Sequence, residues 1–261
     1  MSMVKGDLDD LRYAKTLLEN PSLAARISNL LGTPIEKGFK HLPAKWKDTV
    51  QRATEKSLEK ALNFAIQTMN DRTRTAASEK THKILVFATG AGGGSFGLPA
   101  LTIELPLTTT IMLRSIADIA RSEGEQVKLL ETKIACLEVF ALGGKSKNDD
   151  GTETGYFVVR AALARAISDA TKYIAEKGLA REGAPALVKF IAALATRFGI
   201  IVSEKVAAQA IPLIGAAGGA LINTIFIDHF QNMARGHFII RRLERLYDKD
   251  LIRQEYDNLD L

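Results

Sequence analysis

The sequence has almost no cysteine and no apolar leader. Cys136 is the only cysteine in 261 residues, so the chain cannot form an internal disulfide. Its neighbours in 134–137 are apolar, which predicts a buried thiol in a reducing compartment. The first ten residues contain four charged side chains, whereas a secretory signal peptide needs an uninterrupted apolar stretch. We therefore expect a cytoplasmic protein.

A strong charge of either sign is also missing. The 35 basic and 30 acidic side chains leave a net charge of +5, with an isoelectric point near 9.2. Basic residues are interleaved with acidic ones and no recognition motif accompanies them, so we expect no nucleic-acid partner. The small basic excess permits attraction to phosphate or to anionic lipid headgroups. Hydrophobic residues at 46% and charged residues at 25% predict an ordinary folded domain.

Apolar residues at helical spacing are the main pattern in the sequence. In 46–69, apolar residues such as Trp46, Val50 and Leu58 recur at helical spacing. Similar patterns cover 126–142, 156–175, 184–198, 202–210 and the stretch from Gly236 onward. We therefore predict an all-α fold, a single multi-helix globular domain. Within it we expect short helices in 1–40 that pack on the core, a helical body in 41–247, and a C-terminal tail in 248–261.

Two central apolar helical segments are interrupted by glycine and proline. In 84–113 the only charged residue is Glu104, and Pro106 is expected in the first turn of a helix that ends at Ser122. The segment 207–227 has no charged residue and is about long enough to cross a bilayer as a helix. Its Pro212 and its polar residues favour burial in the protein core. Partial membrane insertion, or a cavity for an acyl chain, is the alternative interpretation.

Two enzyme fingerprints overlap in the glycine-rich stretch 92–97. It satisfies the dinucleotide-binding pattern G-x-G-x-x-G and also G-x-S-x-G, which would make Ser95 a nucleophile. Both patterns need a strand before the glycines and a helix after them. Pro99 follows almost at once, and the chain lacks the strand–helix alternation of a parallel sheet. We therefore predict no nucleotide site, no nucleophile elbow and no cofactor.

Polar side chains close to these segments supply the candidate functional residues. Glu104, Asp228, His229 and His237 are candidates for acid, base or metal-ligand roles near Ser95. His229 and His237 point about 80° apart on a helix, so no metal is predicted. The candidate ligand contacts are Arg114, Asp118, Asn223, Asp228, Arg235 and His237. Charged side chains that recur at helical spacing usually form salt bridges between helices. The guanidinium groups of Arg114 and Arg235 would also suit a phosphate or a carboxylate.

Several strings in the chain resemble the bacterial EcsC family. The most specific are Glu-Leu-Pro-Leu-Thr-Thr-Thr at 104–110 and Ala-Arg-Gly-His-Phe at 234–238. The resemblance extends over residues 40–247. It implies a bacterial, intracellular and helical protein, and it implies no catalytic mechanism or cofactor. The family is named after a protein encoded beside an ABC transporter in the ecs operon, which implies work near a membrane.

These observations favour a non-enzymatic protein that is cytoplasmic or peripheral to the inner membrane. We expect it to bind a lipid, another apolar ligand or a membrane partner, through the low-charge segments and the arginines that follow them. The alternative is a metal-dependent or Ser/His hydrolase-like enzyme that uses Glu104, Asp228, His229 and His237. The sequence leaves the oligomeric state open.

Overall fold

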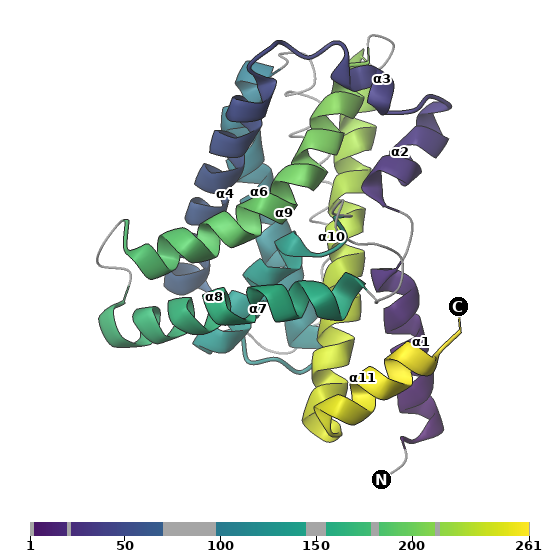
Figure 1. Cartoon of the computed structure of the whole chain (residues 1–261), viewed down its shortest axis with the longest axis vertical. Helices are drawn as coiled ribbons and strands as arrows, with labels where there is room; N and C mark the ends of the chain where they lie inside the picture. Colours follow the sequence, from purple (N-terminus) through teal and green to yellow (C-terminus); the bar gives the residue numbers. More distant parts are fainter. Residues whose placement is uncertain are drawn as a thin grey trace.

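The chain folds as a bundle of helices (Figure 1). The computed structural model describes residues 3–19, 22–69, 98–144, 155–178, 183–211 and 215–260. These ranges contain no strand, which confirms the prediction of an all-α single domain. The glycine-rich stretch 92–97, with Ser95 and both enzyme fingerprints, lies outside the described residues. The helices are α1 (Lys5–Leu18), α2 (Leu23–Leu31), α3 (Glu36–Phe39), α4 (Trp46–Thr68), α6 (Leu98–Ser122), α7 (Leu130–Glu138), the 3-10 turn η1 (Val139–Ala141), α8 (Gly155–Lys177), α9 (Pro185–Gln209), α10 (Gly215–Leu246) and α11 (Lys249–Asn258).

Helix α10 is the central element of the bundle. It contacts α1, α2, α6, α9 and α11. Helix α6 runs parallel to it, because Glu104 bonds to Asn223 near the start of both helices and Glu123 bonds to Arg242 near the end of both. Both helices therefore begin at the same end of the molecule, beside α3 and the first turn of α4, at the top of Figure 1.

Four phenylalanines form the centre of the core. Phe140 of η1, Phe198 of α9, and Phe226 and Phe230 of α10 are all fully buried. Neighbouring ring centroids lie 5.1 to 5.5 Å apart, in tilted or edge-to-face arrangements. Burying each ring contributes about 1.5–3 kcal/mol. This cluster fixes α9 and α10 against the end of α7.

Helix α9 is long and apolar enough to cross a membrane, judged by length and composition alone, with a mean hydropathy of 1.8. It also packs against α2, α3, α4, α8 and α10. Phe190, Phe198 and Lys205 on this helix are fully buried. We therefore interpret α9 as a core helix of the bundle.

The two interrupted segments differ from expectation in their boundaries. Pro106 is not in a first turn but inside α6, which begins eight residues earlier. Pro99 takes the favoured position in the first turn, so the helix can start there. Segment 207–227 is not one helix, because α9 ends at Gln209 and α10 starts at Gly215, on either side of Pro212. Of its residues whose burial is described, eight are buried, six are half-buried and Leu221 is exposed.

The ends of the chain pack on the same part of α10. Gly236 allows α1 to approach closely, since a Cβ there would lie 3.0 Å from the carbonyl oxygen of Ala14. The residues predicted as a tail include α11, which Asp248 caps by accepting hydrogen bonds from two backbone N–H groups. Tyr256 of α11 is fully buried, and Lys15 of α1 donates to its carbonyl oxygen at 2.8 Å. Residues 248–260 are therefore an integrated part of the bundle.

Candidate functional site

A buried ion pair joins three helices at the end where α6 and α10 begin. Lys205 of α9 donates from Nζ to Oε1 of Glu104 on α6 at 2.7 Å, and Asn223 of α10 donates to the same oxygen at 3.1 Å. The side chain of Lys205 is 0% exposed and that of Glu104 is 7% exposed. The ammonium also lies 5.0 Å from the centroid of the Phe226 ring. Lys205 thus neutralises a carboxylate that has almost no access to water.

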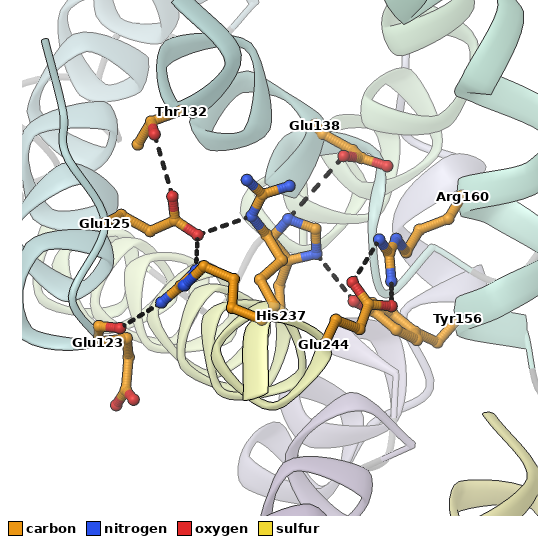
Figure 2. A network of polar contacts seen from close by, with 10 residues as sticks. Glu123, Glu125, Thr132, Glu138, Tyr156, Arg160, His237 and Glu244 are labelled. Atoms are coloured by element: carbon orange, nitrogen blue, oxygen red, sulfur yellow. Dashed lines mark hydrogen bonds and ion pairs between the residues drawn. The ribbon is translucent and has the colours of Figure 1, made fainter. Parts of the chain in front are cut away.

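A second buried polar cluster lies further along α10 (Figure 2). Nδ1 of His237 is 3.0 Å from the hydroxyl oxygen of Tyr156 on α8. On the other side of the ring, Nε2 is 3.9 Å from Oε2 of Glu138 on α7. His237 is fully buried, and among the described residues its Nε2 has no hydrogen-bond partner. The imidazole therefore links α10 to α8 and lies beside a carboxylate of α7.

Burial sets the protonation of this second cluster. It raises the pKa of Glu138 to about 7, although the charges of Arg160 and Arg241 oppose the shift. Burial lowers the pKa of His237 well below its usual value, and the same two arginines lower it further. His237 is consequently neutral at pH 7, while Glu138 exchanges its proton near neutrality. Groups with such pKa values are candidates for function.

The raised pKa of Glu138 predicts a pH-dependent stability. The folded state holds this proton up to about pH 7, whereas the unfolded chain loses it near 4.5, so stability falls as pH rises between these values. We expect Glu138→Gln to stabilise the protein at pH 8 by roughly 2 kcal/mol and to change it little at pH 4.5. Urea unfolding of both proteins at the two pH values measures this difference. Equal stability differences at both pH values would contradict it.

Exposed and half-buried ion pairs surround the second cluster. Arg160 donates two hydrogen bonds to Glu244, at 2.7 and 3.1 Å. Burial alone would raise the pKa of Glu125, but its hydrogen bond with Arg241, the charges of Arg241 and Arg245, and a bond from Thr132 together lower it. Figure 2 shows these pairs on both sides of α10. They are interhelical salt bridges, the interpretation that the sequence favoured for charged side chains at helical spacing.

The structure does not bring the four enzyme candidates together. Glu104 lies in the first cluster and His237 in the second, about 20 Å apart along α10 by helical rise. Asp228 lies 4.0 Å from a guanidinium nitrogen of Arg26 on α2. His229 packs on Gly143, and burial lowers its pKa to about 4. The described residues contain no group of three His, Cys, Asp or Glu side chains suited to a metal.

The candidate ligand contacts are likewise distributed along the bundle. The guanidinium of Arg114 stacks 4.8 Å from the centroid of the Phe64 ring on α4. Asp118 pairs with Arg121 on the same helix. Arg235 is half-buried on α10, between the positions of Asp228 and His237. Asn223 belongs to the first cluster, so these six residues form no single site.

Sequence reasoning missed the partners that complete both clusters. Lys205 was not singled out, because one lysine beside Glu204 in a helical pattern resembles any solvated pair. Glu138 had a clearer signal, since it is the only charged residue in the apolar run 134–144. A lone carboxylate in such a run indicates a buried partner.

The fold and the two clusters define an all-α protein in which buried polar side chains of the long central helix α10 bond to polar side chains of neighbouring helices. The chain belongs to the EcsC protein family, which matches residues 9–243. The matched region includes most of α1, so it begins earlier than the resemblance noted from the sequence. No curated protein and no solved structure matches the chain.

Proposed function

We propose that this protein is a non-enzymatic peripheral membrane protein that binds a bilayer with the end where α6 and α10 begin. Large apolar side chains are exposed there. Ile103 and Leu107 of α6 are 78% and 51% exposed, and Leu221 of α10 is 41% exposed. Ile103 and Leu107 are one helical turn apart, so they face the same way.

The distribution of charge along the two parallel helices carries the proposal. Residues 98–113 of α6 contain one charged side chain, Glu104, which is buried with Lys205, and residues 215–227 of α10 contain none. Charges begin at Arg114 on α6 and at Asp228 on α10. Because the helices are parallel, their uncharged halves lie at the same end of the bundle. Exposed apolar side chains without charged neighbours on the same helices are typical of a surface that contacts lipid or a partner.

The energy of such a contact is sufficient for reversible binding. Moving a fully exposed leucine or isoleucine out of water yields about 1.5–3 kcal/mol. Two or three partly exposed side chains therefore supply a few kcal/mol, in the range of reversible peripheral attachment. The cytoplasmic face of a bacterial inner membrane fits this proposal and the expectation from the family resemblance.

Vesicle flotation tests the proposed function. The wild-type protein is expected to float with vesicles of phosphatidylethanolamine and phosphatidylglycerol. Ile103→Ser with Leu107→Ser should weaken partitioning about tenfold or more, because two apolar contacts are lost. The matched control is Leu129→Ser with Leu246→Ser, two exposed leucines (44% and 60%) at the opposite end. Wild-type protein that does not float, or equal losses in both variants, would exclude this surface.

A further inference from the structure

Four exposed lysines lie within eleven residues around the connection between α3 and α4. They are Lys37 of α3, Lys40 and Lys45 of the connection, and Lys47 of α4. The ring of Trp46, at the start of α4, packs on Phe39 of α3 with a centroid distance of 5.4 Å. Nζ of Lys47 lies 5.9 Å from the centroid of the Trp46 ring. The aromatic contact therefore fixes α3, which carries Lys37, against the start of α4, which carries Lys47.

This part of the chain lies at the same end as the exposed apolar side chains. Gly38 of α3 sits directly on the carbonyl oxygen of Ala207, near the end of α9. Two residues earlier on α9, Lys205 bonds to Glu104, the neighbour of Ile103 in sequence. Figure 1 shows the first turn of α4 beside the start of α6, and α3 beside the start of α10, all at the top of the view. A bilayer that covers Ile103 and Leu107 therefore has the lysines close to its headgroups.

We infer that residues 37–47 form a headgroup-binding surface, in which the four lysines contact anionic phospholipid and Trp46 lies at the level of the headgroups. This inference rests on the proposed function, because it names the lipid class and the orientation. With Glu36 and Asp48 as the only acids, residues 36–48 have a net charge of +2. Each basic residue near an anionic surface contributes to binding. Tryptophan favours the boundary between headgroups and acyl chains, because its ring is apolar and its N–H is polar.

An anionic bilayer fits this surface better than an acidic protein or a nucleic acid. The lysines lie at the same end of the bundle as the exposed apolar side chains of α6, a helix that carries no exposed charge before Arg114. A bilayer presents an anionic plane directly over an apolar interior, so it can cover both surfaces at once. A nucleic acid would leave Ile103 and Leu107 in water.

The single tryptophan makes the inference directly measurable. Trp46 is the only tryptophan in the chain, so intrinsic fluorescence under selective excitation reports on this residue alone. With vesicles containing phosphatidylglycerol, its emission should shift to the blue and be quenched by lipids brominated near the headgroup. The binding should weaken as salt is raised, because exposed charges are screened.

A charge series separates this inference from the proposed function. Replacing the four lysines of residues 37–47 by glutamine should weaken binding to phosphatidylglycerol vesicles by roughly a hundredfold. The control replaces four other exposed lysines, Lys5, Lys172, Lys177 and Lys249, by glutamine and should retain most of the binding. If the wild type binds phosphatidylglycerol vesicles and the two glutamine variants bind them equally well, the inference that residues 37–47 bind headgroups is wrong. The proposal of membrane binding is then retained. A Trp46 response to RNA and none to vesicles would also overturn the inference. Wild-type protein that binds no vesicle at all removes the proposed function itself.

Discussion

Replacing Lys205 by alanine is expected to destabilise the folded protein by about 3–5 kcal/mol. The substitution removes the ammonium that pairs with Glu104 at 2.7 Å and leaves a carboxylate with 7% side-chain exposure among apolar helices. That carboxylate is then poorly solvated and has no cation beside it, which costs folding free energy. The lost lysine stem adds a cavity next to Phe226. Urea unfolding at pH 7 measures the change.

Two further variants distinguish pairing from simple truncation. Lys189→Ala shortens an exposed lysine on the same helix and is expected to change stability by less than about 0.5 kcal/mol. Lys205→Met combined with Glu104→Leu replaces both charges by apolar groups and should recover most of the lost stability. If Lys205→Ala costs no more than Lys189→Ala, the buried pair does not stabilise the fold.

The sequence was sufficient to predict elements whose apolar residues follow one period. Helix α4 was expected over 46–69 and is observed at Trp46–Thr68. The boundaries were predicted less well where apolar residues surround the whole helix, because no face distinguishes a start or an end. For this reason 184–198 and 202–210 were separated although they form the single helix α9. Pro106 was placed in a first turn because proline favours that position, whereas α6 already begins at Leu98.

The clusters could be predicted only in part. His237 and Glu104 were identified as unusual, because each is a polar residue next to an apolar segment. Their partners are 81 and 101 residues away in sequence, and local spacing contains no information about such contacts. The four enzyme candidates were grouped because each is a carboxylate or an imidazole close to a low-charge segment. Helical rise separates His237 from Asp228 and His229, and each of the four contacts a different neighbour.

The two halves of α10 are held in the bundle by different kinds of contact. Its second half carries the arginines and Glu244, whose ion pairs fix α1, α8 and the connection between α6 and α7. Among the described residues, its first half is linked to α6 and α9 by the Glu104–Lys205–Asn223 contact and to α2 by the pair of Asp228 and Arg26. Helix α3 joins this end through a close backbone approach to α9. The proposed membrane-binding end is thus held together mainly by close packing. A change in packing there should affect stability and vesicle binding together.

Gly38→Ala is expected to be the clearest case of that coupling. A Cβ on residue 38 would lie 1.8 Å from the carbonyl oxygen of Ala207, far inside van der Waals contact, and a backbone atom cannot rotate away. Helix α3 must therefore move off α9, at a cost of about 3 kcal/mol. Gly6→Ala is the matched control, because a Cβ there has no neighbour within 4 Å and alanine favours the helix by roughly 0.5–1 kcal/mol.

The same substitution also displaces Lys37 and Lys40 from the end of the bundle. We therefore expect Gly38→Ala to lower the urea midpoint and to weaken binding to phosphatidylglycerol vesicles under conditions where the protein is still folded. Circular dichroism on the vesicle sample establishes that the helices remain. A variant with the wild-type midpoint would show that α3 does not pack on α9 as described. A lowered midpoint with unchanged vesicle binding would instead place the lipid contact away from α3, because only a surface independent of that helix could tolerate its displacement.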